Sequence, residues 1–173
     1  TQEIGQETRE RTHLLHSLYA AFQHERLFVA YQPQVDLRTR KPLGFEALMR
    51  WRDDKGDFIP PDRFIPLAEQ SGLINGMGRW VMRSALRTLR RLLDAGWTDL
   101  RMAVNVSVVQ FQADDFIDNV AQALHETGVP PRLVELEITE SVAMTNAAEV
   151  EEKLHALKAL GTTIAIDDFG TGF

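Results

Sequence analysis

The feature that most constrains the fold is an alternation of strand-like and helical runs along the chain. Strand-like runs occupy residues 27–35, 43–51, 100–108, 133–139 and 161–169. Helical patterns occupy residues 61–70, 79–94, 114–126 and 147–160, and Gly96, Gly128 and Gly161 follow the last three as helix stops. A strand–helix–strand order favours parallel strands joined by crossover helices, so the chain is predicted to belong to the α/β class.

The region before the first strand predicts one helix. Residues 7–23 place five apolar side chains along one side, namely Leu14, Leu15, Leu18, Ala21 and Phe22. We expect residues 1–26 to be a lead-in helix or linker from an upstream region, and residues 27–173 to form the following domain. A plain packing helix is an equally good interpretation of the first segment.

Four of the strand-like runs carry a polar side chain where a buried strand should be apolar. Strands covered on both faces read as nearly continuous apolar runs. The exceptions lie mostly toward the C-terminal half of their runs, and they are Glu46, Asn105, Glu135 with Glu137, and Asp167. In barrels of parallel strands, active sites gather at the C-terminal ends of the strands. The pattern therefore predicts a site at that end of the sheet.

Each acid taken alone has an ordinary explanation. Arg50 shares a strand face with Glu46 and could form an ion pair with it, and Asp167 with Asp168 could cap a helix. As a converging set they are harder to explain, because two carboxylates ~4 Å apart repel by about 4 kcal/mol at an effective dielectric constant near 20. Several such pairs would rival a total stability of roughly 5–15 kcal/mol. Either the acids are spread apart or cations hold them together.

The side-chain chemistry of this set suits a hard divalent cation. Carboxylates and an amide carbonyl, without cysteine, favour Mg²⁺ or Mn²⁺ over Zn²⁺. The adjacent acids Asp167 and Asp168 could serve two neighbouring ions, an arrangement used for in-line displacement at phosphorus. These residues alone predict a divalent-metal site and leave the substrate open.

Composition excludes several other classes of protein. A net charge of −6 argues against a binder of nucleic-acid polymers. No apolar run approaches the ~18 residues of a membrane span, so no membrane contact is expected for this segment, although other regions could anchor it. The absence of cysteine fits a cytoplasmic location.

Six ordered motifs resemble the EAL-domain family, the bacterial phosphodiesterases of cyclic di-GMP. The triplet Glu46-Ala47-Leu48 lies within "GFEALMRW". The other motifs are "YQP" (31–33), "FIPLAEQSGLI" (64–74), "NVS" (105–107), "ELEITES" (135–141) and "DDFGTGF" (167–173). Three letters recur by chance, whereas six motifs in family order, covering the chain from about residue 27 to its end, identify it as a member.

The resemblance implies a fold and a reaction. The family fold is a modified TIM (β/α)8 barrel whose first strand runs antiparallel to its neighbours. The family reaction is metal-dependent hydrolysis of cyclic di-GMP to linear pGpG.

The resemblance also assigns roles to individual residues. It makes Glu46, Asn105, Glu137 and Asp167 metal ligands, with Asp168 at the second metal. Glu46, Asp167 and Asp168 form the catalytic set. Arg50 would contact a substrate phosphate, and Gln32 would lie in the substrate groove or only satisfy backbone groups. Glu140 would stabilise the loop over residues 168–173.

The resemblance further implies that the barrel is incomplete in these 173 residues. About five of eight strands are present, which makes this the N-terminal two-thirds of the domain. The family's "KxD" lysine, the general base, and its later "EGVE" glutamate fall outside the sequence. We expect a phosphodiesterase in the intact parent, with little activity in this stretch alone. The alternatives are a catalytically inactive cyclic di-GMP receptor or a truncated interaction module. Expected partners are an upstream sensory or diguanylate cyclase domain and a second subunit in a homodimer.

Overall fold

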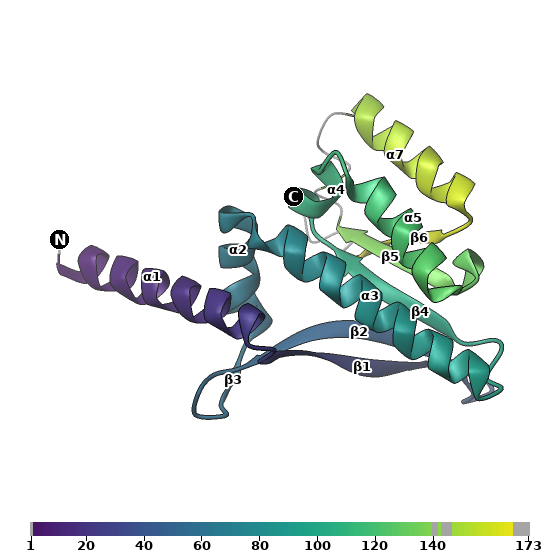
Figure 1. The fold of residues 1–173 in the computed structure, drawn as a ribbon, viewed down its shortest axis with the longest axis horizontal. Coiled ribbons are helices and arrows are strands. Elements are labelled where there is room, and N and C mark those ends of the chain that lie inside the picture. The colour runs from purple at the N-terminus through teal and green to yellow at the C-terminus, as the bar shows by residue number, and fades with distance from the viewer. Residues whose placement is uncertain (1, 140–141, 143–146, 168–173) are drawn as a thin grey trace.

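The structure is a computed structural model that describes residues 2–139, 142 and 147–167. Helices and strands alternate through most of the chain (Figure 1). The strands are β1 (Leu27–Val35), β2 (Pro42–Arg52), β3 (Phe58–Ile59), β4 (Arg101–Val106), β5 (Val134–Thr139) and β6 (Thr163–Asp167). The helices are α1 (Gln2–Gln23), α2 (Pro61–Ser71), α3 (Leu73–Asp94), α4 (Val108–Gln112), α5 (Phe116–Thr127), the 3-10 turn η1 (Pro131–Leu133) and α7 (Ala147–Leu160).

The strands form one mixed sheet. Its order is β1-β2-β4-β5-β6, and the short strand β3 pairs with the C-terminal end of β2. Strand β1 runs antiparallel to β2, whereas the pairs β2–β4, β4–β5 and β5–β6 are all parallel. The α/β class and the antiparallel first strand are therefore confirmed.

Most element boundaries agree with the sequence expectation, and the exceptions have physical reasons. Strand β1 spans the predicted residues, and α7 matches its predicted range. Helix α3 begins at Leu73, six positions before the expected start, because buried Ile74 and Met77 stabilise a turn that two glycines would disfavour. Helix α4 was not predicted at all. Strand β6 is described over 163–167, so the expected residues 168–169 lie outside the described part.

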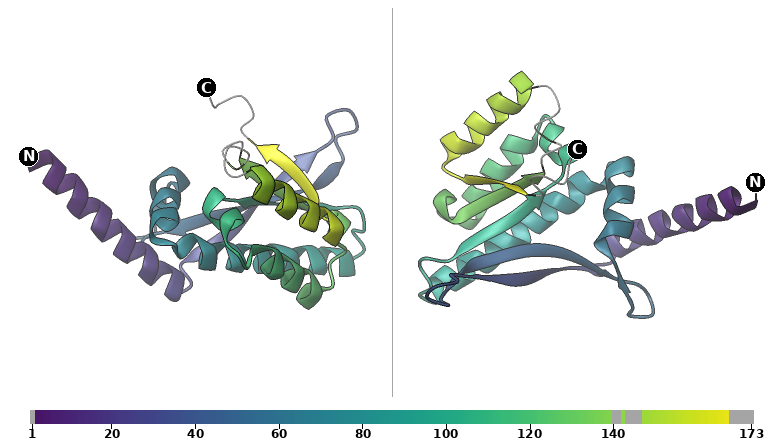
Figure 2. Two further views of the ribbon diagram at one scale, coloured as in Figure 1. Left: turned by 90° about the horizontal axis from the view of Figure 1, so that it is seen from above. Right: turned by 180° about the vertical axis from the view of Figure 1, so that it is seen from behind.

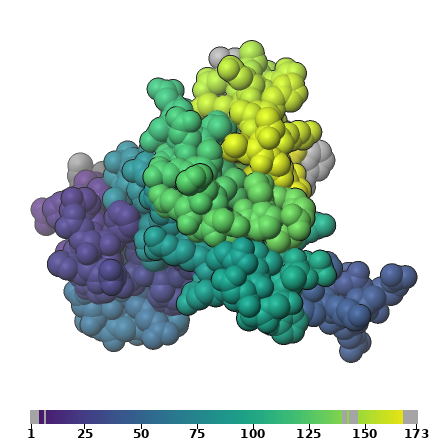
Figure 3. Space-filling view, turned by 45° about the vertical axis from the view of Figure 1, so that its right-hand side comes forward, coloured from purple at the N-terminus to yellow at the C-terminus, as the bar shows by residue number. Residues whose placement is uncertain are grey.

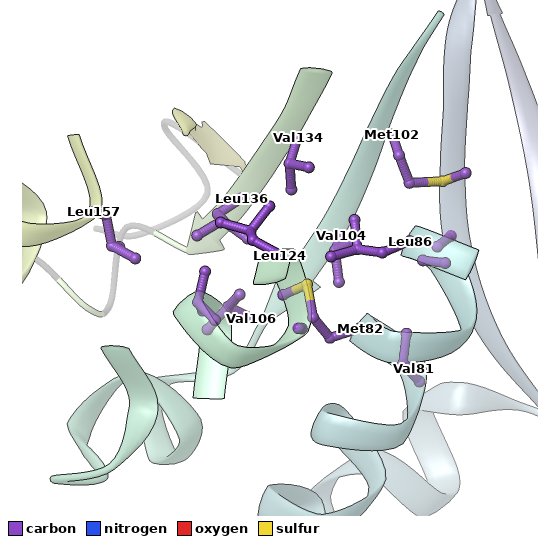
Figure 4. Close-up of a cluster of buried hydrophobic side chains, with 14 of the residues drawn as sticks. Val81, Met82, Leu86, Met102, Val104, Val106, Leu124, Val134, Leu136 and Leu157 are labelled. Atoms are coloured by element: carbon purple, nitrogen blue, oxygen red, sulfur yellow. The ribbon is translucent and has the colours of Figure 1, made fainter. Parts of the chain in front are cut away.

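The main core lies between the sheet and helices α3, α5 and α7, which cover one face of it (Figures 1 and 4). Alternate residues of β4 and β5 point into this core, and Met102, Val104, Val134 and Leu136 are at most 2% exposed. They meet α3 through Leu86 and the outer helices through Leu124 and Leu157 (Figure 4). Because one face of each strand is committed to this core, the alternate residues must point to the opposite face.

A second core joins α1 to the body. Leu18 and Ala21 of α1 pack with Phe64 and Ala68 of α2, and the exposed N-terminal part of α1 extends away from the sheet (Figure 2). Trp51 lies in this cluster and meets the Phe64 ring edge-on, with centroids 5.7 Å apart. Trp97, by contrast, belongs to neither core, because this side chain is 54% exposed in the turn after α3.

The β1–β2 hairpin projects from the body (Figure 3). Asp36 orders its turn by accepting hydrogen bonds from the backbone N–H of Thr39 (2.6 Å) and of Arg38 (2.9 Å). The bond from Thr39 is the main reason why the pKa of the Asp36 carboxyl is lowered. A firm turn of this kind sets the β1–β2 register, which in turn places Gln32 opposite Glu46.

Candidate active site

The sheet register places the four predicted strand residues on one face, opposite the main core. Asn105 of β4 is level with Glu137 of β5. Glu46 is level with Ala103, and Asp167 with Thr139, so each lies two residues out of step with its neighbour on the same face. A stagger of this kind is the shear that accompanies strand tilt in a closing sheet. Backbone topology thus brings Glu46, in the middle of β2, to the same face of the sheet as the C-terminal ends of β4, β5 and β6.

The best-defined contact of the site joins two of these residues. The Asn105 Nδ2 donates a hydrogen bond of 2.7 Å to Glu46 Oε1. Glu46 is half-buried and Asn105 is exposed, so the pair lies at the surface of the sheet and open to a ligand. An amide is neutral, so beside a carboxylate it causes less repulsion than a second carboxylate would. Its carbonyl oxygen can still serve as a metal ligand.

The two residues predicted to contact substrate lie beside this pair. Gln32 is directly opposite Glu46 in the antiparallel β1–β2 register, which puts both side chains on the same face. Arg50 lies four residues beyond Glu46 on that face, and its Nη1 donates to the Met49 carbonyl oxygen at 2.9 Å. No ion pair among the described side chains joins Arg50 to Glu46. The Arg50 guanidinium is therefore not occupied by the Glu46 carboxylate.

The donor set suits a hard divalent cation in type. Glu46, Asn105 and Glu137 supply carboxylate and amide oxygens on neighbouring strands, which Mg²⁺ and Mn²⁺ prefer. Within the described side chains, no three histidines, cysteines, aspartates or glutamates gather closely enough to hold a metal ion. The side chain of Asp167 and all of Asp168 and Glu140 lie outside the described residues, so a full ligand set stays a prediction.

A cavity opens next to the site, between the strand ends and helices α2 and α3. Its polar lining includes Arg50, Glu69, Asn105, Ser107, Gln110 and Thr139. Its remaining walls are mainly aliphatic, with Leu48 and Ile65 among them. An apolar hollow with a few convergent polar groups is the usual form of a small-molecule site.

Helix α4, which follows Asn105, was not predicted from the sequence, although its start carries a recognisable signal. Ser107 caps α4, since its Oγ accepts from the Gln110 N–H at 3.2 Å, and the Gln110 Oε1 accepts from the Ser107 N–H at 3.2 Å. This is a capping box, and its S-x-x-Q pattern was readable in the sequence.

The fold and this acidic face define an α/β domain of the TIM-barrel type with a candidate ligand site on one face of its sheet. A sequence profile of the EAL domain matches residues 15–173. The chain belongs to the EAL domain family, as its motifs indicated.

Two relatives and one solved structure show the likeness in detail. The bifunctional diguanylate cyclase/cyclic di-GMP phosphodiesterase MucR of Pseudomonas aeruginosa is 41% identical over 165 residues, which are 95% of this chain and 24% of that protein. The cyclic di-GMP phosphodiesterase NbdA of the same organism is 38% identical over 173 residues, covering 100% of this chain and 21% of that protein. A structure described as the PaMucR phosphodiesterase in a c-di-GMP complex superposes with a TM-score of 0.89 at 42% identity, over 93% of this chain and 65% of that one.

The chain thus spans about a quarter of the length of these curated relatives. Similarity at this level confirms the family and the modified TIM-barrel fold class.

Proposed function

We propose that this chain is part of a phosphodiesterase that hydrolyses cyclic di-GMP to linear pGpG with the help of Mg²⁺ or Mn²⁺. One observation carries the proposal: Asn105 and Glu46 are joined by a 2.7 Å hydrogen bond on the face that also bears Glu137. The structure described as the PaMucR phosphodiesterase in a c-di-GMP complex, which is 42% identical to this chain, supports the choice of substrate.

In this proposal each site residue has one task. Glu46, Asn105, Glu137, Asp167 and Asp168 would hold the metal ions, which when bound polarise the phosphate and lower the pKa of water. The strands would hold Glu46, Asn105 and Glu137 in place, so that little reorganisation is needed when the substrate binds.

Two further residues would hold the substrate itself. Arg50, whose guanidinium is paired to no carboxylate among the described residues, would bind a phosphate oxygen of cyclic di-GMP. Gln32, exposed beside Glu46, would contact the substrate in the groove. Glu140 would stabilise the segment after β6.

The domain organisation and partners belong to the same proposal. Residues 1–26 would join the EAL domain of residues 27–173 to an upstream domain, as the bifunctional name of MucR suggests for that relative. A sensory or diguanylate cyclase domain there, a homodimer and a cytoplasmic location are the corresponding expectations. Among the described helices, none is both long and apolar enough to cross a membrane.

The proposal is tested by replacing Glu46 with Gln in the full-length protein that carries this sequence. The change keeps the size of the side chain but removes the charge, so Mn²⁺-dependent turnover of cyclic di-GMP should fall by at least ~100-fold. Turnover is measured by chromatographic separation of cyclic di-GMP from pGpG. Glu151→Gln, the same change on the exposed face of α7, is the matched control and should leave turnover unchanged.

The outcomes separate the possible functions. Unchanged turnover in Glu46→Gln would remove this residue from the site. A wild-type protein that binds cyclic di-GMP without cleaving it in Mn²⁺ would be a receptor. A protein that neither binds nor cleaves cyclic di-GMP would be an interaction module, contrary to the proposal.

A further inference from the structure

The short helix α4 lies between the candidate site and the outer helices. It has 5 residues and begins at Val108, three positions after Asn105. A helix of this length is far below what is stable on its own, because nucleation costs more than a single turn returns. Its position must therefore come from contacts at its ends and sides.

The N-terminal end of α4 is held by its capping box and by α3. The Gln110 side chain that completes the box lies directly against Gly78 of α3, where a Cβ would overlap its amide nitrogen. The absence of a side chain at Gly78 therefore lets α3 support Gln110 at close range. Gln110 also lines the cavity beside Asn105.

The C-terminal end of α4 is held by one ammonium group from a distant helix. Lys153 of α7 donates to three consecutive carbonyl oxygens, those of Phe111 (3.0 Å), Gln112 (3.0 Å) and Ala113 (3.2 Å). Its Nζ also lies 3.2 Å from a Glu149 carboxylate oxygen, and the Lys153 side chain is only 13% exposed. A cation at a helix C-terminus satisfies carbonyl groups that have no partner within the helix and complements the negative end of its dipole.

This contact connects two strands of the candidate site. Helix α4 follows β4, which carries Asn105, and α7 leads through a short turn into β6, which ends at Asp167. Strands β4 and β6 are not neighbours in the sheet, since β5 lies between them. Lys153 therefore connects two helices outside the sheet. It links α4, which follows the predicted ligand Asn105, to α7, which precedes the predicted ligand Asp167.

We propose that Lys153 is a positioning residue of the metal site, acting through α4 on Asn105. By holding the C-terminal carbonyls of α4, it keeps the backbone after β4 in one conformation and so keeps the Asn105 amide directed at Glu46. This inference rests on the proposed function, because it assumes that Asn105 and Glu46 bind metal. It adds a residue that none of the sequence motifs contains.

The test replaces Lys153 with Met in the full-length protein, which keeps the length of the side chain but removes every donor. Two quantities are measured without substrate: the Mn²⁺ dissociation constant by titration calorimetry, and hydrogen exchange of the α4 amides in metal-free protein. We expect the Mn²⁺ dissociation constant of Lys153→Met to be about 10-fold higher than that of the wild type, as is typical when a group supporting a metal ligand is lost. Exchange at residues 108–112 should become faster.

The matched control is Lys158→Met, the same change at an exposed position of the same helix. It should leave both quantities at their wild-type values. Lys153→Arg keeps a cationic donor and should recover part of the lost affinity, which a purely apolar packing role of the side chain would not predict. If Lys153→Met fails to fold, Lys153→Gln, which keeps two N–H donors, is measured in its place.

The outcomes distinguish this inference from the proposed function. Faster exchange in α4 with an unchanged Mn²⁺ constant would overturn the inference, since Lys153 would then stabilise α4 without affecting the site. A wild-type protein that binds no Mn²⁺ would overturn the proposed function and the inference with it. Wild-type binding with equal constants for Lys153→Met and Lys158→Met would overturn the inference alone.

Discussion

At the scale of single residues, the site combines carboxylates with groups that temper their repulsion. Asn105 donates to Glu46, and Arg50 lies two side chains further along the same face of β2. A row of acids with no such neighbours would lose several kcal/mol to mutual repulsion at an effective dielectric constant near 20. The Asn105 amide reduces this cost before any metal binds, whereas the Arg50 guanidinium, which pairs with no carboxylate among the described residues, is suited to contact a ligand.

Arg50→Ala is expected to weaken substrate binding more than metal binding. A charge-assisted hydrogen bond contributes roughly 1.5–3 kcal/mol, so the dissociation constant of cyclic di-GMP should rise by about 10- to 100-fold. Calorimetry without added Mg²⁺ or Mn²⁺, which separates binding from the proposed metal-dependent turnover, measures it. The Mn²⁺ constant should change by less than about 3-fold.

The matched control for this change is Arg52→Ala. Arg52 follows Arg50 by two residues on β2, but its guanidinium stacks on Phe58 at 4.4 Å and on Phe28 at 5.6 Å. The Arg52→Ala variant should bind cyclic di-GMP with the same dissociation constant as the wild type. Loss of Mn²⁺ affinity in Arg50→Ala, with substrate affinity intact, would contradict the phosphate-binding role.

At the scale of elements, helix α3 contains two glycines, Gly76 and Gly78, that have different surroundings. A Cβ on Gly76 would meet the Phe22 ring at 3.4 Å, an ordinary contact. A Cβ on Gly78 would overlap the Gln110 amide, which cannot move away without breaking the capping box of α4. Replacement by alanine is therefore expected to have opposite effects on stability at these two positions, which are only two residues apart.

Gly78→Ala should lower the free energy of unfolding by about 1–3 kcal/mol, the usual cost of inserting atoms into a filled space. Gly76→Ala should raise it by about 0.5–1 kcal/mol, because alanine loses less backbone entropy in a helix. Chemical denaturation of the two variants, followed by circular dichroism, gives both values. A stabilising Gly78→Ala would show that Gln110 is not needed where the structure places it.

At the scale of the whole molecule, the sheet formed by the described residues has an open edge. Within the described strands, β6 pairs with β5 alone, and Ile166 on β6 is 53% exposed. Sheet edges with exposed apolar side chains recruit other strands, and proteins normally cover them. The 173-residue polypeptide alone therefore carries a surface suited to association.

We expect the 173-residue polypeptide, expressed alone, to self-associate at micromolar concentration and to show almost no phosphodiesterase activity. Sedimentation velocity measures the association. Ile166→Lys, which places a charge on the exposed edge strand, should increase the monomer fraction. A cooperatively folding monomer with strong activity would contradict this expectation.

Much of the fold was readable because periodicity reports burial directly. The apolar run of β1 and the amphipathic pattern of α7 gave correct boundaries, since each element buries one face or both. Helix α3 was predicted too short, because glycine propensity concealed a turn that Ile74 and Met77 stabilise by burial. Apolarity alone does not report burial in the same way, since Trp97 lies exposed after a helix.

The sequence by itself determined the α/β class, the family and the type of ligand atom at the strand ends, because motif order and strand period are local properties of the chain. Only the tertiary structure decided that Asn105 bonds to Glu46, 59 positions away, and that Lys153 holds the carbonyls of a helix some 40 positions earlier. Such contacts depend on strand register and on helix packing across the sheet. Neither leaves a periodic signal in the sequence, which is why the residues that orient the site were the hardest to predict.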